Sequence, residues 1–378
     1  MNIINKKEKV IVALSGGVDS SVTCVLLKEQ GYEVEAVFMK NWTPQSEAEG
    51  LLMCPFLADE KDARLVASQL GIKLSVVSFE KEYRSQVVEY LFKEYQEGRT
   101  PNPDILCNSR IKFKVFLEKA LSRGADFVAT GHYVRKSVIS NQISVIRENK
   151  NHRLPITDSR LLLLRGIDPD KDQSYFLYQI TQEQLAKCLF PIGEYHKTQV
   201  RELAKKFGLA TQAKKDSQGI CFVGEVQIKE FLKQRIKPQV GDVVTVDGKK
   251  IGEHEGVWYY TIGQRKGIGV GGGIPYYVVE KDLSNNRLIV ARGDNDKSLF
   301  KNELIADEVH WILGAKPEFP LKCSAKIRYR QKNQECTVEK INQTQVKVTF
   351  KEKQRAITPG QFVVFYQDQV VLGGGKIL

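Results

Sequence analysis

Two groups of residues in this chain have the types and spacing that chemistry requires, and the first is a loop of glycines and serines. The sequence Ser15-Gly16-Gly17-Val18-Asp19-Ser20-Ser21 follows a short apolar run and precedes a predicted helix. Glycines adopt positive φ easily, and the N–H groups at a helix start bind anions. A P-loop would need a lysine after its last glycine, and this loop has none. It predicts a cradle for a pyrophosphate group, in which Asp19 caps the helix or helps to hold a magnesium ion. The alternative is a tight strand-to-helix turn.

The second group is a pair of cysteines in basic surroundings. Cys107 precedes a predicted helix with three basic side chains, and Cys221 follows Lys214 and Lys215. Neighbouring cations and a helix start lower the pKa of a thiol, so both cysteines are predicted to be partly thiolate. A structural role is the alternative for each. Two other cysteines stand among apolar residues and are predicted to lie in the core (Cys24 and Cys188).

Together these groups could replace a carbonyl oxygen by sulfur. Oxide is a poor leaving group, but transfer of AMP from ATP to that oxygen makes it a good one. A persulfide on one cysteine can then attack the activated carbon, and the second cysteine releases the sulfur by forming a disulfide with the first. Because Cys107 and Cys221 are far apart in the sequence, the fold must bring them together.

The elements that must position these residues alternate between strand and helix. Strands are predicted at 10–14, 34–40, 73–79 and 126–130, with helices at 20–30, 60–71 and 111–124 between them. Such alternation is typical of a doubly wound parallel sheet, whose ligands lie beyond the carboxyl ends of the strands. Ser15, Met39 and Gly131 fall there. The polar segment 136–160 is predicted to be a hairpin insertion or a mobile loop, and helices follow at 181–190 and 197–208.

The second half of the chain is predicted to be β-structure. Alternating strands and an Asp-Gly turn after residue 222 predict hairpins, and the last 90 or so residues predict a small barrel or sandwich. The stretch that begins at Gly267, GIGVGGG, formally matches GxGxxG but lacks a following helix, so a hairpin loop is favoured over a dinucleotide site. We therefore predict domains at 1–222, 223–290 and 291–378.

The composition limits the function classes. A formal net charge of +12 among 378 residues favours a polyanionic partner. Seven scattered cysteines without a CxxC pair argue against a disulfide scaffold and against a zinc site of close ligand spacing, so no metal site is predicted. No apolar run approaches the roughly 20 residues of a membrane span, and the run at 10–14 is too short for a signal peptide. A cytoplasmic enzyme with no membrane contact is expected.

The charge is concentrated near the C-terminus. Residues 321–356 carry ten Lys or Arg and three acidic residues. The alternation in LKCSAKIRYRQ predicts one strand with Lys322, Lys326, Arg328 and Arg330 on a single face. A solvated outer face is the alternative, but this concentration of charge favours contacts with the phosphates of a nucleic acid.

Seven motifs in order carry a resemblance to a known family: SGGVDSSV, FMKNW, GRTPNPDILCN, ATGHY, DKDQSYFL, DSQGICF and YTIGQRKGIG. The first resembles the PP-loop of ATP pyrophosphatases, and the whole series resembles the tRNA-specific 2-thiouridylases (MnmA/TrmU family) over nearly the entire chain. The resemblance implies a PP-loop catalytic domain, a small central domain and a C-terminal β-barrel acting on the wobble uridine of tRNA. It implies ATP as cosubstrate, with magnesium, and a protein that donates persulfide sulfur. A monomer is expected.

The resemblance also implies roles for individual residues. Cys107 resembles the nucleophile, Cys221 the persulfide carrier, and Asp104 an acid or base. An iron–sulfur cluster on these three residues is a less favoured alternative, since clusters are normally held by four cysteines. The residues implied in ATP binding are Ala13, Leu14, Ser15, Gly16, Gly17, Val18, Asp19, Ser20, Met39 and Gly131. Those implied in contacts with the target base or the tRNA are Asn102, Pro103, Asp104, His132, Lys171, Asp172, Gln173, Arg328, Tyr329 and Gln361.

Two other functions remain open at this point. One is a PP-loop enzyme that makes an amide or guanidinium group by attack of ammonia or an amino acid on an adenylate, which needs no cysteine pair. The other is a non-catalytic tRNA-binding module in which the loop is structural. Release of pyrophosphate from ATP would exclude the module, and loss of thiolation on cysteine substitution would exclude the amide-forming enzyme.

Overall fold

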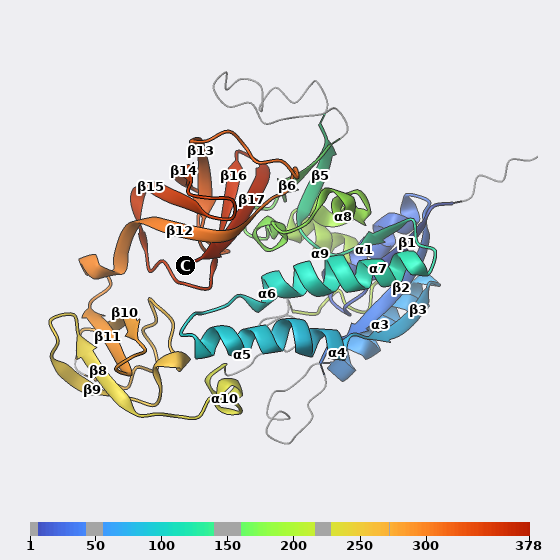
Figure 1. Cartoon of the computed structure of the whole chain (residues 1–378). Coiled ribbons are helices and arrows are strands. Elements are labelled where there is room, and N and C mark those ends of the chain that lie inside the picture. Colours follow the sequence, from blue (N-terminus) through green and yellow to red (C-terminus); the bar gives the residue numbers. More distant parts are fainter. Residues whose placement is uncertain (1–6, 43–55, 140–159, 216–227, 272) are drawn as a thin grey trace, which may run out of the picture.

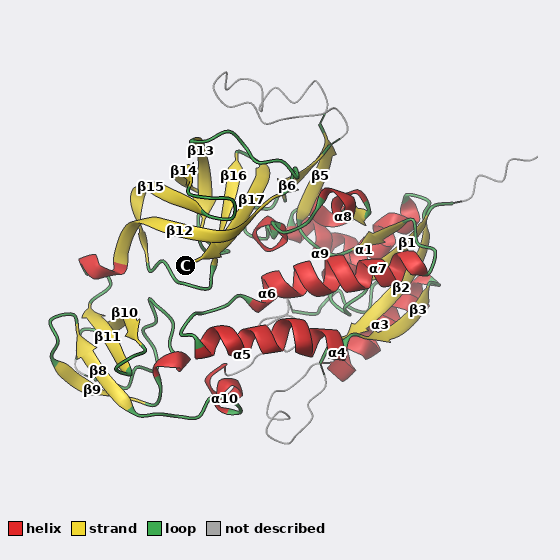
Figure 2. Ribbon diagram, in the orientation of Figure 1, coloured by secondary structure: helices red, strands yellow, loops and turns green. Residues whose placement is uncertain are grey.

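A computed structural model describes residues 7–42, 56–139, 160–215, 228–271 and 273–378. Figure 1 shows an N-terminal α/β part, a small central part and a C-terminal barrel. Figure 2 shows that helices gather in the first part, whereas the other two consist mainly of strands. Among the described residues, none of the helices has the length and apolar character needed to cross a bilayer.

The N-terminal part is built on a parallel sheet, as predicted. Its strand order is β3-β2-β1-β4-β7, and all neighbouring pairs are parallel. The strands are β1 (Lys9–Ala13), β2 (Glu33–Lys40), β3 (Lys73–Ser78), β4 (Phe127–Ala129) and β7 (Cys188–Leu189). The first four match the predicted strands to within one residue at each end. Strands β1, β2 and β4 are largely apolar and buried, whereas β3, at the edge of the sheet, has no buried residue.

Helices cover this sheet, and one of them begins earlier than predicted. The helix that carries Cys107 starts at Pro103, so Cys107 lies one turn inside it rather than before it. Asn102 is its N-cap, since its Oδ1 accepts hydrogen bonds from the backbone N–H groups of Asp104 and Ile105, and Pro103 occupies the first helical position. The helical segments are α1 (Val18–Glu29), α3 (Phe56–Leu70), α4 (Glu80–Tyr83), η1 (Arg84–Val88), α5 (Glu89–Gln96), α6 (Pro103–Leu106), η2 (Cys107–Phe116), α7 (Leu117–Ser122) and α9 (Lys197–Lys206).

The region predicted as one helix at 181–190 divides into two elements. A capping box at Thr181 starts the short helix α8 (Gln182–Ala186), and the edge strand β7 follows it. A two-residue strand is too short to give a readable period. The described residues also contain short 3₁₀ helices: η4 (Ser174–Leu177), η5 (Pro191–Glu194), η6 (Val257–Tyr259) and η7 (Lys297–Leu299).

The polar segment 136–160 belongs to a hairpin, which was one of the two predicted alternatives. Strands β5 (Val134–Val138) and β6 (Leu161–Arg165) are antiparallel partners, and residues 140–159 lie outside the described residues. The hairpin pairs with the C-terminal barrel, because Leu164 of β6 is the register partner of Val370. The first and last parts of the chain therefore share one sheet.

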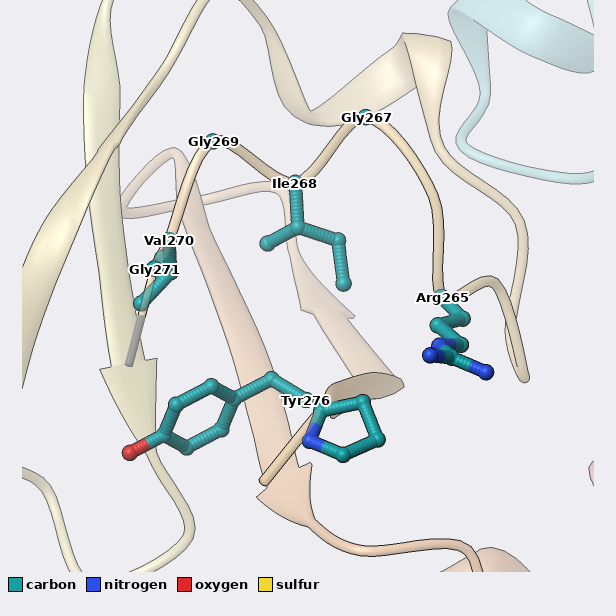
Figure 3. A pocket seen from close by; sticks show the side chains of 8 residues that line it. Arg265, Gly267, Ile268, Gly269, Val270, Gly271 and Tyr276 are labelled. Carbon is teal, nitrogen blue, oxygen red and sulfur yellow. The ribbon is translucent and has the colours of Figure 1, made fainter. Parts of the chain in front are cut away.

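The central part is a four-stranded sheet of order β10-β11-β8-β9 beside helix α10 (Ile228–Lys233). Its strands are β8 (Gly241–Thr245), β9 (Lys250–His254), β10 (Tyr276–Asp282) and β11 (Arg287–Arg292). The glycine stretch from Gly267 leads into β10 rather than a helix, which agrees with the prediction of a loop. With Arg265 and Tyr276 it lines a cavity of about 360 Å³ (Figure 3).

The C-terminal part is a closed antiparallel barrel. Its strands follow the order β12-β15-β14-β13-β16-β17, and β12 also pairs with β17, so no strand edge remains open in this ring. The strands are β12 (Phe300–Trp311), β13 (Leu321–Lys326), β14 (Gln334–Lys340), β15 (Val346–Arg355), β16 (Phe362–Gln367) and β17 (Val370–Ile377). Apolar side chains fill its interior, among them the fully buried Val348 and Phe365.

Candidate active site and RNA-binding face

The glycine–serine loop joins β1 to α1 and is held by its own hydroxyls. Ser20 Oγ accepts a hydrogen bond from the backbone N–H of Ser15 (3.2 Å) and donates to the carbonyl of Gly17 (3.1 Å), to which Ser21 Oγ also donates (2.8 Å). Of the two glycines only Gly16 has a positive φ, +75°, whereas Gly17 is extended at −94° and is the N-cap. Asp19 does not cap α1, so that alternative was wrong.

Asp19 instead forms an ion pair with Lys197, which lies in none of the motifs of the sequence. Lys197 Nζ lies 2.7 and 2.9 Å from the two carboxylate oxygens of Asp19, and Tyr133 donates its hydroxyl to the same carboxylate at 2.7 Å. Lys197 is buried at the first position of α9, where its backbone N–H donates to Asp168 at 2.8 Å. The loop without a lysine thus receives one from a distant helix.

A second lysine, Lys214, also reaches the loop. Its Nζ donates to the carbonyl of Gly16 (3.0 Å) and pairs with Asp59 (2.6 Å) and Asp62 (2.5 Å). Burial alone would lower the pKa of Lys214, but the hydrogen bonds with the two carboxylates outweigh burial and raise it. The amine is therefore charged at neutral pH. Cys221, whose pKa Lys214 was predicted to lower, lies outside the described residues.

The ends of the neighbouring strands lie beside the loop, as predicted. A Cβ on Gly131 would come within 2.8 Å of the backbone nitrogen of Ser20, so this glycine abuts the first turn of α1. Leu14 donates its N–H to the carbonyl of Val37 on β2. Met39, farther along the same strand, has its side chain buried in the core. Asn41, which follows β2, was not selected from the sequence. Its buried side-chain amide has no hydrogen-bond partner in the described part of the chain, and such a group is one that a ligand could satisfy.

Two of the predicted tRNA contacts are buried. The His132 ring is enclosed beside Phe113, its Nδ1 is 2.7 Å from Thr130 Oγ1, and burial, together with nearby Lys112, sets its pKa well below the ordinary value. His132 is therefore neutral at physiological pH. The Asp172 carboxylate is also inside, where it accepts hydrogen bonds from Arg165 (2.8 Å) and from the backbone of Gly166 and Ser174. In this conformation neither side chain presents a polar group at the surface.

Cys107 is fully buried at the start of η2. Its backbone N–H already bonds to carbonyls of the preceding turn, so it is not one of the unpaired donors of the helix start, contrary to the prediction. Asp104 lies in the first turn of the same helix, and Asn108 donates its side-chain amide to the Asp104 carbonyl at 3.0 Å. The core assignment of Cys24 and Cys188 is confirmed, and burial raises the pKa of each thiol to about 12.

The two segments predicted to contact tRNA, one before η4 and one after β13, lie together. Tyr329 packs its ring 4.5 Å from that of Phe176, and its hydroxyl lies 3.5 Å from the carbonyl of Lys171. Gln173 accepts a hydrogen bond from the Tyr133 backbone at 3.0 Å. Exposed Arg328 donates to the Ala356 carbonyl at 2.7 Å. These residues combine a basic group with an aromatic ring, a combination that RNA-binding faces use.

The prediction that four basic residues share one exposed strand face is wrong for Lys326. Strand β13 ends at Lys326, and this lysine is 4% exposed and lies 3.7 Å from Asp172 rather than facing solvent with Lys322. Burial lowers the pKa of Lys326, which the Asp172 charge partly offsets. Lys326 therefore joins the barrel to the α/β part.

Metal ligands do not gather in the described residues, where no group of three or more His, Cys, Asp or Glu side chains forms a candidate site. Cys221, one member of the proposed cluster-binding set, lies outside those residues.

The comparisons with known proteins agree on one family. Three family models match consecutive regions: "tRNA methyl transferase HUP domain" at 8–225, "tRNA methyl transferase PRC-barrel domain" at 229–292 and "Aminomethyltransferase beta-barrel domain" at 301–377. The chain is 52% identical to the tRNA-specific 2-thiouridylase MnmA of Marinomonas sp. (strain MWYL1), over 99% of this chain and 92% of the relative. It is 50% identical to that of Haemophilus ducreyi, over 99% and 93%.

Solved structures resemble the chain more distantly. A 4-thiouridine synthetase in complex with RNA and ATP is 20% identical, with a TM-score of 0.36, over 60% of this chain and 50% of that one. NMN synthetase from Francisella tularensis is 16% identical, with a TM-score of 0.33, over 56% and 67%.

Proposed function

The chain belongs to the MnmA family of tRNA-specific 2-thiouridylases, and we propose that it replaces the carbon-2 oxygen of the wobble uridine by sulfur through an adenylated intermediate. It is a tRNA-thiolating transferase of an ATP-using family. The observation that carries the proposed mechanism is the loop at Ser15–Ser21, to which Lys197 and Lys214 are both bonded. A loop of this kind binds the phosphates of ATP.

In the first step the uracil oxygen attacks the α-phosphorus of ATP and pyrophosphate leaves. The N–H groups at the start of α1 and the two lysines stabilise the negative charge that develops on the departing pyrophosphate. Asp19 would hold a magnesium ion, which commonly binds one or two carboxylates and the substrate phosphates and here would neutralise phosphate charge. Asn41 offers a donor and an acceptor to a base edge.

In the second step the terminal sulfur of a persulfide on Cys221 attacks carbon 2 and AMP leaves. The Cys107 thiolate then attacks the Cys221 sulfur, the bond to the transferred sulfur breaks, and 2-thiouridine departs with that electron pair. A disulfide between Cys107 and Cys221 remains, and a thiol reductant supplies two electrons to restore both thiols. A sulfur-donor protein then renews the persulfide. We take the enzyme to act as a monomer.

An iron–sulfur cluster does not fit this donor set. Asp104, Cys107 and Cys221 supply only two thiolates, whereas such clusters are normally held by four. We therefore derive no step through a cluster.

For tRNA recognition we assign direct contacts to the exposed and half-buried groups and positioning roles to the buried ones. Lys171, Arg328 and Tyr329 meet the phosphates and a splayed base, and Gln173 and Gln361 assist them. Asp172 acts from inside by fixing the loop that carries Lys171 and Gln173. His132 holds the loop after β4, whose next residue, Tyr133, donates to Gln173. Asn102 and Pro103 start the helix that presents Asp104 to the target base.

The descriptions of the family models mention methyl transfer, whereas the relatives are thiouridylases. A phosphate-binding loop and a cysteine pair suit adenylation and sulfur transfer, and methyl transfer requires neither. Mass spectrometry of nucleosides from tRNA incubated with the protein, ATP and a persulfide donor tests the proposal. We expect 2-thiouridine and an equal amount of pyrophosphate. Pyrophosphate without 2-thiouridine would instead support an amide-forming enzyme.

A further inference from the structure

The segment between α5 and α6, residues 97–101, is bonded to both other parts of the chain immediately before the Asn102 cap. On the barrel side, Thr100 donates its backbone N–H to Pro359 (2.9 Å), and Gln361 donates its side-chain amide to the carbonyls of Thr100 (2.8 Å) and Pro101 (3.3 Å). On the central side, the Thr100 hydroxyl lies 3.3 Å from that of Thr261. Figure 1 shows the loop that follows α5 lying between these two parts. We call residues 97–101 the junction segment.

The helix that leads into the junction segment is fixed in the same way. Glu94 of α5 is 2% exposed and accepts two hydrogen bonds from Arg99 (2.6 and 2.7 Å), with Lys376 of the barrel at 3.6 Å. From the central part, Phe231 stacks on Phe92 with ring centroids 5.1 Å apart. A shift of the barrel or of the central part would therefore strain α5.

Two glycines allow the close approach of the three parts. Gly98 has φ +74°, and a Cβ there would lie 2.6 Å from the Leu283 side chain of the central part. Gly360 of the barrel has φ +89°, and a Cβ there would lie 2.9 Å from the backbone nitrogen of Thr100. Because these groups are closely packed, a displacement of the barrel or the central part is passed on to the junction segment.

We propose that the junction segment positions the helix of Asp104 and Cys107 in response to tRNA, so that RNA bound on the barrel sets the geometry of the reacting groups. This inference rests on the proposed function. The helix is capped by Asn102, directly after the junction segment, and the Asn102 side chain is hydrogen-bonded to the first turn at Asp104 and Ile105. Thr100 and Gly360 are therefore positioning residues that act through the segment and do not touch the substrate.

The test compares two glycine substitutions in the barrel. Gly360→Ala places a methyl group against Thr100, whereas Gly314→Ala, at φ +70°, meets no atom of the described residues within 4 Å. Both variants incur the strain of a left-handed alanine, and Gly360→Ala adds the clash with Thr100, so its melting temperature should fall further and both rates are measured where both variants are folded. We expect Gly360→Ala alone to reduce single-turnover thiolation at saturating tRNA and ATP, on the order of 10²-fold, as for a small misplacement of reacting groups. Its Kd for tRNA should not change.

A second pair of variants covers the case in which Gly360→Ala fails to fold. Thr100→Val removes the hydroxyl that faces Thr261, and Thr100→Ser keeps it, so only the valine variant should slow thiolation. Unchanged thiolation in Gly360→Ala and Thr100→Val, or a loss explained entirely by weaker tRNA binding, would overturn the inference. If the wild-type protein and Gly314→Ala themselves make no 2-thiouridine, the proposed function fails instead.

Discussion

Lys197 Nζ makes two short contacts, 2.7 and 2.9 Å, with the carboxylate of Asp19, although 178 positions separate the two residues. The pair is only partly exposed, and Tyr133 donates to the same carboxylate. A magnesium ion on Asp19 would compete with the lysine for these oxygens, which would allow the amine to turn to the phosphates. We therefore expect these two residues to adopt a second arrangement when ATP is bound.

Substitution of Lys197 should therefore impair adenylation. We expect Lys197→Met to reduce tRNA-dependent pyrophosphate release by about 10²-fold, comparable with the loss of one transition-state donor, and Lys197→Arg to retain part of the rate. Asp19→Ala should abolish adenylation. Gel-shift assays should show normal tRNA binding by all three variants. Lys206→Met, at the exposed end of the same helix, is the control. Equal rates in Lys197→Met and Lys206→Met would exclude a role for Lys197.

Substitution of Cys107 should separate ATP binding from sulfur transfer. Cys107→Ser is expected to bind ATP and tRNA but to give no 2-thiouridine by nucleoside mass spectrometry, because serine cannot resolve the persulfide. Cys221→Ser should behave in the same way. Cys323→Ser is the matched control, since this thiol lies in the barrel beside Cys336, 3.7 Å away, and has no role in the mechanism. Thiolation by Cys107→Ser at the wild-type rate would refute the two-cysteine mechanism.

Asp172 should prove important for stability. In Asp172→Asn the new amide group can face Arg165 Nε, a donor that then loses its carboxylate acceptor, and Lys326 loses its charged partner. Breaking a buried pair in this way costs about 3–5 kcal/mol, so the urea midpoint should fall clearly. Asp170→Asn, two residues earlier and exposed, should leave the midpoint unchanged. Equal midpoints for the two variants would show that the Asp172 interactions contribute little.

The sequence was sufficient for the first strands of the parallel sheet because β1 and β2 are apolar runs, each followed by a helix of readable period, but it did not predict the helical segment from α4 to α5 that follows β3. It was also sufficient for the glycine–serine loop, since the residues that shape this loop are neighbours. It could not reveal Lys197, because an ion pair over so long a separation leaves no local pattern. The same holds for Lys326, whose burial depends on Asp172 from another part of the chain. The early helix start does have a local signal, because Asn102 followed by Pro103 is a typical N-cap and first helical position.

Arg328 should contribute to tRNA binding through phosphate charge. Burial and the nearby Arg355 both lower the pKa of Arg328, so two guanidinium groups lie close together and attract a phosphate. We expect Arg328→Ala to weaken tRNA binding and to reduce the slope of log Kd against log salt by about one unit. Lys119→Ala, on the exposed side of α7, should leave the slope unchanged. A wild-type slope in Arg328→Ala would rule out the phosphate contact.

Lys281 should make the stability of the protein depend on pH above neutrality. Its ammonium group donates to the Tyr260 carbonyl at 2.9 Å, and burial lowers its pKa from 10.5 to about 8. Between these two values the unfolded chain binds a proton that the folded protein has released, so stability rises with pH across that window. Below about pH 8 both states are protonated and the full cost of burying the charge remains. At about 1.4 kcal/mol for each pKa unit, that cost reaches at most about 3.5 kcal/mol. Lys281→Met should therefore be more stable than the wild type at pH 7 and should lose this advantage by pH 10, as measured by urea unfolding.

Lys249→Met, at an exposed turn of the same part, is the control for Lys281→Met. A difference between Lys281→Met and the wild type that stays constant from pH 7 to pH 10 would show that the amine is not buried in its charged form.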